Sequence, residues 1–306
     1  MNASSTTKAV VLLIICTFFW GSCFPIGKHA LNEVHALTLV FWRFTIAAVC
    51  LALYILVMGA ERFALTIRQW IWVVAVSAVG VGGLNLGLFT GLEHTAATNG
   101  SLIMALSPLM TALIACVAMR SLPTLPQCFS LVVSLSGVLM VITNGHLETL
   151  LTMDINQGDK MIFSGMLAWS FYTYCSQNIS RWMPVIPYTL VGMLSGATVI
   201  GLMCLATPEV HPFAELVSSS AIGMTEVVYI GVFGTVAGYL LWLNGVRELG
   251  SPTAALFFNF VPVFAVLTAY MMGQAVTQLQ LIGIAIVILG LLLPRLPVFR
   301  KATQAV

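Results

Sequence analysis

Two stretches of the chain decide its fold. The first is Gly91–Met119, GLEHTAATNGSLIMALSPLMTALIACVAM, and the second is Gly245–Gly273, GVRELGSPTAALFFNFVPVFAVLTAYMMG. They align at a constant offset that places Pro108 opposite Pro262. The identities are few, but both stretches hold the same place in the order of apolar segments. We therefore expect two copies of one structural unit.

The composition places this repeat in a membrane. Of the 306 residues 59% are hydrophobic and only 7% are charged, and the mean hydropathy is +1.02. A soluble domain usually has about a quarter of its residues charged, so a water-soluble globule is excluded. The balance of 12 Lys and Arg against 10 Asp and Glu gives no support for nucleic acid as a partner. The lipid bilayer is the expected surrounding.

Ten apolar segments predict an all-α integral membrane protein. A spanning helix needs roughly 20 apolar residues, because the hydrocarbon core is about 30 Å thick. The segments are continuous, whereas strands of a transmembrane barrel would alternate. They lie near 8–27, 35–58, 68–90, 95–119, 125–144, 159–180, 186–206, 220–243, 250–272 and 277–295.

The basic residues predict the orientation. With both termini in the cytoplasm, nine Lys and Arg side chains lie on the cytoplasmic side, and only Lys28 and Lys160 lie on the outer side. Five spans per copy is an odd number, so the two five-helix repeats are inverted relative to each other. We expect a first repeat at 1–145, an outer linker loop at 146–158, a second repeat at 159–296 and a cytoplasmic tail at 297–306.

The paired prolines predict two hinges. A proline inside a helix removes a backbone hydrogen bond and clashes with the carbonyl four residues earlier. Pro108 and Pro262 would free the carbonyls of Met104 and Phe258 in the fourth and ninth spans. Interrupted helices at corresponding places in two halves point to a transporter's binding site, and a packing kink is the alternative.

Further motifs resemble a known family. Trp20–Lys28 (WGSCFPIGK), Phe41–Ala48 (FWRFTIAA) and Gly165–Tyr172 (GMLAWSFY), with the repeated stretch, are similar to signatures of EamA-type transporters in the drug/metabolite transporter superfamily. The resemblance implies a multi-pass carrier of the cell inner membrane with a central cavity between two repeats. It also implies transport of small organic metabolites, frequently amino acids and often outward, so export of amino acids or related compounds is the leading hypothesis.

Charged residues inside spans are candidates for function, because ionisable groups in hydrocarbon cost at least a few kcal/mol. Arg43 could hold a substrate carboxylate, or it could tie backbone carbonyls and reach the interface. Glu226 could bind an amine or carry a proton, or it could be a residue of the outer rim. Together the two charges would suit a zwitterion.

Uncharged side chains complete the expected binding site. Asn85 and Tyr239 occupy equivalent positions at the repeat offset and could line opposite sides of one cavity. Aromatic faces could contact an apolar or cationic ligand, although packing is the alternative for each of them. The remaining members of the expected substrate site are Trp20, Asn99, Trp169, Tyr172 and Asn259.

Small residues predict close helix packing. Gly83, Gly87 and Gly91 lie four apart on the third span, and Gly234 and Gly238 do so on the eighth. We therefore expect the third and eighth spans to be neighbours, with homodimer contacts as the alternative. The sequence is compatible with either a monomer or a homodimer.

The sequence contains none of the motifs that we searched for as signs of ATP hydrolysis or enzyme chemistry. The chain has no Walker loop, no H-E-x-x-H and no G-x-S-x-G, and its seven cysteines form no C-x-x-C pair. We expect no cofactor, no metal and no enzyme activity. The sequence favours a secondary carrier for a small-molecule substrate, working by alternating access, over a passive channel or an intramembrane enzyme.

Overall fold

The computed structural model describes residues 3–59, 61–92, 94–95, 100, 103–121, 123–143, 145–146, 148 and 155–292. The elements found in these residues are helices. The first repeat contains α1 (Ala3–Ala30), α2 (Ala36–Met58), α3 (Ile67–Ser77), η1 (Ala78–Gly83), α4 (Leu84–Leu92), α6 (Ser107–Met119) and α7 (Leu125–Ile142). The second contains α8 (Gln157–Ile179), α9 (Val185–Ala206), α10 (Pro212–Ser218), α11 (Ala221–Tyr229), η3 (Ile230–Ala237), α12 (Gly238–Leu249), α13 (Ser251–Leu256), η4 (Phe257–Asn259), α14 (Phe260–Met271) and α15 (Gln278–Leu292).

Seven helical stretches in the described residues are long and apolar enough to cross a membrane. They are Thr6–Ala30, Ala36–Met58, Ile67–Leu88, Leu125–Ile142, Val185–Ala206, Ala221–Leu249 and Ser251–Met271. The other three expected segments fall on α6 and α15, which are shorter apolar helices, and on α8, which begins with polar residues. The chain is thus all-helical and membrane-spanning, and the number of ten spans stays a prediction.

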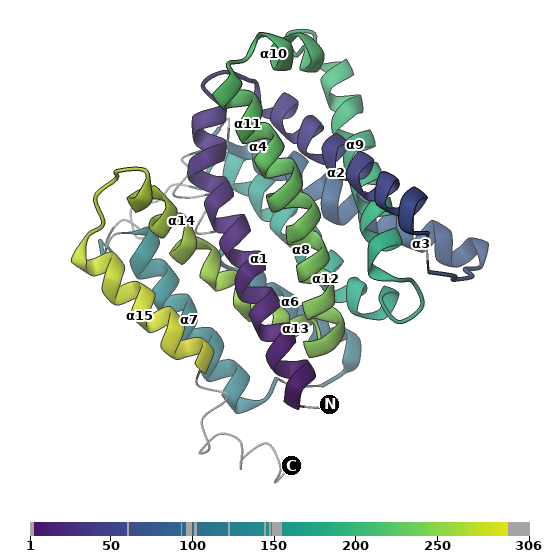
Figure 1. Cartoon of the computed structure of the whole chain (residues 1–306). Helices are drawn as coiled ribbons and strands as arrows, with labels where there is room; N and C mark the ends of the chain where they lie inside the picture. The colour runs from purple at the N-terminus through teal and green to yellow at the C-terminus, as the bar shows by residue number, and fades with distance from the viewer. Residues whose placement is uncertain are drawn as a thin grey trace.

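The helices pack in a pattern that the repeat offset reproduces (Figure 1). Helix α2 packs against α9, and α7 packs against α15. Helix α1 packs against the α11–η3–α12 stretch, and its counterpart α8 packs against the α3–η1–α4 stretch. These main contacts between spans are thus matched by the contacts of the corresponding spans in the other copy. We call the face where α1 begins the terminal face, and α10 lies at the opposite face.

Two π-helical segments interrupt the third and eighth spans at matching places. Segments η1 and η3 end at Gly83 and Ala237, which are equivalent at the repeat offset. In a π-helix the backbone hydrogen bonds join residues five apart, instead of four apart as in an α-helix. Such segments are frequent at functional sites. The sequence did not predict them, because a π-helix has no motif beyond the glycines it tolerates.

The prolines lie beside two further interruptions. Pro108 is in the first turn of α6, directly after a turn at residues 105–106, and Ser107 Oγ donates to the Met104 carbonyl at 2.7 Å. Pro262 is in the first turn of α14, and α14 begins directly after the 3-10 segment η4. The expected breaks therefore occur at corresponding places in the two copies. Their role as hinges stays a prediction.

The expected tight packing of the third span against the eighth is wrong: their glycine faces pack against other spans, although the two spans approach each other at Asn85 and Tyr239. A Cβ on Gly87 would meet the Met161 carbonyl at 2.6 Å, and a Cβ on Gly91 would meet the Gly158 carbonyl at 2.7 Å. Both carbonyls belong to α8, the sixth span. The glycines do permit close packing, as expected, but identical patterns on two helices do not show which partner each helix has.

Candidate functional site

A cluster of buried aromatic rings lies where the two repeats meet. Trp20 from α1 contacts Trp242 with ring centroids 5.1 Å apart and Trp169 with ring centroids 5.5 Å apart. Trp169 stacks on Tyr172 at 5.5 Å with an interplanar angle of 25°. We define the aromatic cluster as Trp20, Trp169, Tyr172, Tyr188, Tyr239, Trp242 and Phe258. Four of its members were expected at the substrate site.

Asn85 and Tyr239 meet at the edge of this cluster. Their side chains lie close together, and both residues are buried, at 3% and 2% exposure. Asn85 Nδ2 also donates to the Val81 carbonyl of η1 at 2.8 Å. The structure therefore brings together the two residues that the repeat offset paired, and it attaches them to one of the π-helical segments.

Trp20 and Arg43 both reach the other π-helical segment. Trp20 Nε1 donates to the Gly234 carbonyl at 2.9 Å, and Arg43 Nε donates to Thr235 Oγ1 at 3.1 Å. Thr235 Oγ1 in turn donates to the Ile230 carbonyl, five residues earlier. Trp20 and Thr235 thus each donate to a backbone carbonyl of η3, and Arg43 donates to the Thr235 hydroxyl. The side chain of Arg43 thus links α2 to η3.

Glu226 lies near the opposite face and forms an ion pair. Its Oε1 is 2.8 Å from Nδ1 of His29, which is charged only when protonated. The Glu226 side chain is 14% exposed and the His29 side chain is 48% exposed. The contact joins α11 of the second repeat to the end of α1 in the first. The structure does not bring Glu226 into the aromatic cluster.

Two more carboxylates join the repeats at the same face. Glu33 accepts from the Ser220 N–H at 2.6 Å and from its hydroxyl at 2.8 Å, and these bonds lower the pKa of Glu33. Partial burial raises the pKa of Glu215, but the N–H groups of His35 and His211 outweigh it and the net pKa is lowered. Three carboxylates, Glu33, Glu215 and Glu226, therefore connect the two repeats at this face.

A lateral cleft of about 280 Å³ separates the α7–α15 pair from α1 and α14. Asn259 and Pro262 line it, and Phe258 joins it to the aromatic cluster. Asn259 Nδ2 donates to Ser134 Oγ on α7 at 2.8 Å. The lateral cleft is therefore lined by two of the expected site residues, whereas Asn99 lies outside the described residues.

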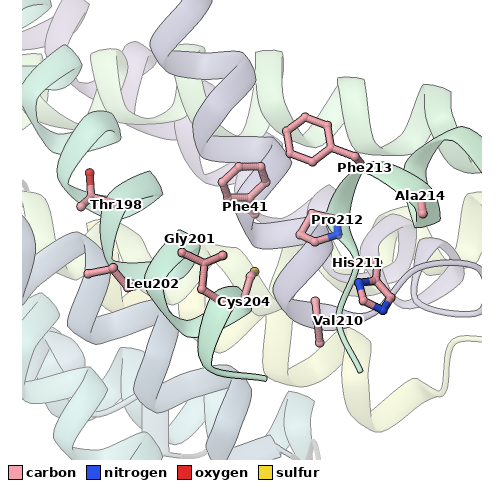
Figure 2. Close-up of a pocket in the computed structure, with 11 residues that line it drawn as sticks. Phe41, Thr198, Gly201, Leu202, Cys204, Val210, His211, Pro212, Phe213 and Ala214 are labelled. Atoms are coloured by element: carbon pink, nitrogen blue, oxygen red, sulfur yellow. The ribbon is translucent and has the colours of Figure 1, made fainter. Parts of the chain in front are cut away.

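A larger groove of about 660 Å³ lies at the periphery, between α2, α9 and α10 (Figure 2). Phe41, Phe213 and Leu202 line it, and none of the expected site residues does. Its lining is almost entirely apolar and faces outward beside exposed leucines of α9. Its position on the surface, away from both interrupted spans, gives no reason to place a substrate there. No cluster of potential metal ligands occurs in the described part of the chain.

Sequence reasoning missed several members of the site. Trp242, Tyr188 and His29 were not singled out, although the first two are fully buried. An aromatic residue in an apolar span is equally suited to lipid and to the interior. For Trp242 a signal existed: it lies three residues after Tyr239 and so shares its helix face.

Equivalent helix packing in the two halves, paired interruptions and an interior aromatic cluster are typical of one class of protein, the helical membrane transporters built from repeats. The model of the EamA-like transporter family matches the chain twice, at residues 7–143 and 156–295. The chain belongs to this family. It is therefore a transporter and not an enzyme.

Relatives extend over nearly the whole chain. An uncharacterized transporter of Bacillus subtilis, YyaM, is 31% identical over 284 residues, which is 92% of each chain. A probable terminal-alkyne amino-acid exporter of Streptantibioticus cattleyicolor is 24% identical and covers 94% of this chain and 93% of its own. A solved crystal structure shares the fold with a TM-score of 0.74 at 17% identity, over 96% of this chain and 97% of that one.

Proposed function

We propose that the chain is a secondary carrier that exports amino acids or related small organic compounds by alternating access. The observation that carries this proposal is the pair of interrupted spans around the aromatic cluster. Segments η1 and η3 lie at equivalent places in the two repeats, and each is bound by side chains beside the cluster. Discontinuous helices at a repeat interface are how many carriers form a site that opens to either side.

The proposed architecture has ten spans in two inverted repeats, at 1–145 and 159–296. The terminal face is then cytoplasmic in a bacterial inner membrane, in accord with the distribution of basic residues. The bacterial origin of several relatives supports this location. The substrate would pass the aromatic cluster, with Asn85 and Tyr239 as polar contacts, and Arg43 would position η3.

The amino-acid part of the proposal has a narrower basis. It rests on the relative described as a probable terminal-alkyne amino-acid exporter and on the resemblance of the chain's motifs to EamA-type transporters. Glu226 is proposed as the proton-coupling group, because a carboxylate that pairs with a histidine can exchange a proton at the opposite face. Glu226→Gln should then remove the dependence of transport on a pH gradient, and unchanged coupling in that variant would exclude Glu226.

Counterflow in proteoliposomes tests the function. Vesicles holding the purified protein are loaded with a mixed pool of amino acids and metabolites, and entry of labelled solutes is followed by mass spectrometry. Saturable uptake that a trans solute stimulates is expected for one chemical class. Flux without trans-stimulation would indicate a channel instead, and transport of a class without amino groups would contradict the amino-acid proposal.

Two matched tryptophan variants test the role of η3. Trp20→Phe keeps an aromatic ring but loses the Nε1 bond to the Gly234 carbonyl of η3. Trp42→Phe loses a similar Nε1 bond, of 2.8 Å, to the Pro212 carbonyl at the periphery. We expect exchange to slow by about tenfold in Trp20→Phe and to change little in Trp42→Phe. Equal rates in the two variants would contradict the role of η3.

A further inference from the structure

Arg43 is a cation inside a span, and the protein leaves most of its hydrogen-bonding capacity unused. It is the eighth residue of α2, about 10 Å from the start of that helix at the usual helical rise. None of the ion pairs in the described part of the chain includes it. A charge taken out of water loses its hydration and needs a partner in return. Arg43 therefore indicates an anion that the described residues do not supply.

The guanidinium of Arg43 points into the protein and not toward lipid. Its Nε donates to Thr235 Oγ1 at 3.1 Å, and Thr235 is fully buried in η3. Ile46 lies three residues after Arg43 and shares its helix face. A Cβ on Gly231 of η3 would meet the Cβ of Ile46 at 3.0 Å, so this face of α2 packs against the second repeat. The charge of Arg43 is thus held between the two repeats.

The two terminal nitrogens of this guanidinium are unpaired and reachable. Within the described residues, the bond from Nε to Thr235 is the only hydrogen bond that the Arg43 side chain makes. Arg43 is partly exposed, and neither Nη1 nor Nη2 is among the fully buried polar atoms that lack a partner. Both nitrogens therefore keep accessible surface. A small molecule can reach this end of the side chain in the structure as it stands.

The surroundings of the guanidinium are uncharged and adjoin the aromatic cluster. The ring of Phe44 lies 5.4 Å from Cζ of Arg43. The charge of Arg43 is close enough to act on the thiol of Cys23 in α1 and on the hydroxyl of Tyr239 in α12. Tyr239 is a member of the aromatic cluster and contacts Trp20. An anionic group beside Arg43 would therefore lie at the edge of the aromatic cluster, with the rings available to its apolar body.

We propose that Nη1 and Nη2 of Arg43 bind the carboxylate of the transported solute, while the aromatic cluster receives its apolar body. The planar guanidinium fork matches a carboxylate with two parallel hydrogen bonds. The inference rests on the proposed function and narrows its substrate class to carboxylic acids. An amino group is not required, because the structure does not bring Glu226 into the aromatic cluster. Since Nε of the same group holds Thr235, a bound carboxylate is also joined to η3.

Chemical labelling of arginine tests this assignment. Phenylglyoxal, which reacts with accessible guanidinium groups, is applied to the wild-type protein in lipid nanodiscs, and labelled peptides are identified by mass spectrometry. The protecting probes are two matched pairs, hexanoate with hexanamide and 3-phenylpropanoate with 3-phenylpropanamide, and chloride is the control for inorganic anions. We expect a carboxylate to protect Arg43 at about ten- to a hundredfold lower concentration than its amide, as for charge-assisted hydrogen bonds. Labelling of Arg68, which is exposed on α3, should be the same in all samples.

Variants identify the binding group by a second measurement. The rise in melting temperature that each probe causes in detergent reports its affinity. Arg43→Gln should make carboxylate and amide equal, and Arg43→Lys, which keeps the charge but not the planar fork, should retain part of the preference. Arg68→Gln removes an exposed arginine and should keep the full preference. If Arg43→Gln does not fold, the labelling of the wild-type protein still decides.

Four results would overturn the proposal. Absence of label on Arg43 would mean that its terminal nitrogens are not reachable. Failure of both carboxylates to protect Arg43, or equal protection by their amides, would mean that no carboxylate binds there, and equal protection by chloride would mean an inorganic anion. A carboxylate preference that persists in Arg43→Gln would assign the binding to another group. Because the readout is binding, protection of Arg43 without any counterflow would refute the carrier alone, and counterflow of amines without protection would refute the carboxylate site alone.

Discussion

The same position in the two repeats carries opposite chemistry. At the opposite face Glu226 of α11 forms an ion pair with His29 of α1, whereas its equivalent in the first repeat is Trp72 of α3. Trp72 packs edge-on against Phe171 of α8, with ring centroids 6.2 Å apart and an interplanar angle of 83°. The α1–α11 pair is thus joined by a contact that responds to pH and salt, and the α3–α8 pair by apolar rings. Corresponding helix pairs in the two copies are held by different forces.

The asymmetry extends to the π-helical segments. Segment η3 is held by donors from the other repeat, Trp20 and Arg43, and η1 is held by Asn85 of its own span. For a carrier, we expect from this difference that movement of α11 against α1 breaks polar contacts and that movement of α3 against α8 separates packed rings. The following predictions test that difference.

Substitutions of two equivalent glycines should have the largest effect. A Cβ on Gly80 would overlap Tyr172, meeting its Cγ at 2.6 Å and Cδ2 at 2.7 Å, near the root of a side chain that cannot move away. A Cβ on Gly234 would meet only the sulfur of Cys23 closely. Gly80→Ala should destabilise the protein by about 1–3 kcal/mol and Gly234→Ala by less, as measured by thermal unfolding in detergent.

A second substitution serves as the control for this pair. In Cys23→Ala the sulfur is absent, so adding Gly234→Ala should cost almost nothing, because the new methyl group has space. Persistent destabilisation in the double variant would mean that η3 needs glycine for its backbone. In that case the effect of Gly234→Ala would come from the backbone conformation of η3 and not from the packing of the added methyl group.

Loss of the contact between Trp72 and Phe171 should have the next largest effect on stability. Trp72→Ala removes the edge-to-face pair with Phe171 and should destabilise the protein by about 1 kcal/mol, by the same amount at low and high salt. Trp72→Phe retains a ring at this place and should behave nearly as the wild type. A strong salt dependence of the Trp72→Ala effect would contradict the apolar account of this contact.

Loss of the ion pair should have a smaller effect that salt abolishes. Glu226→Gln lowers the melting temperature at low ionic strength, and the difference should vanish in about 1 M salt, because partly exposed pairs are screened. His29→Gln should match it, and the double variant should add nothing further. Additive effects in a double-mutant cycle would show that the two side chains do not act as a pair.

The smallest effect concerns pH at the start of α11. The pKa of Glu33 is lowered by its bonds to Ser220, so its folded value lies below the unfolded value of about 4.3. Its contribution is therefore complete above that unfolded value and is lost as the pH falls through the folded one. Hydrogen-exchange protection of Gly223 and Met224 should decrease over this range in the wild type and stay constant in Glu33→Gln.

The sequence predicted the helices well because their apolar lengths reflect the thickness of a bilayer. It also paired Asn85 with Tyr239 from the repeat offset alone, and the structure brings them together. It could not predict which spans pack tightly together, since small-residue patterns on different helices are alike: the glycine faces of the third and eighth spans pack against the sixth and first spans, and not against each other. The π-helical segments and the His29 contact were missed because both depend on three-dimensional neighbours that no local pattern encodes.

A pair of distances tests the central claim of alternating access with unequal ends most directly. In a cysteine-free background, spin labels at Leu31 and Ile222 report the opposite face, and labels at Arg68 and Arg181 report the terminal face; all four residues are exposed. Double electron–electron resonance measures the two inter-label distances in the protein without and with the combined substitutions Glu33→Gln and Glu226→Gln. We predict that the first distance lengthens while the second shortens. A longer first distance with an unchanged second one, or no change in either, would contradict the account.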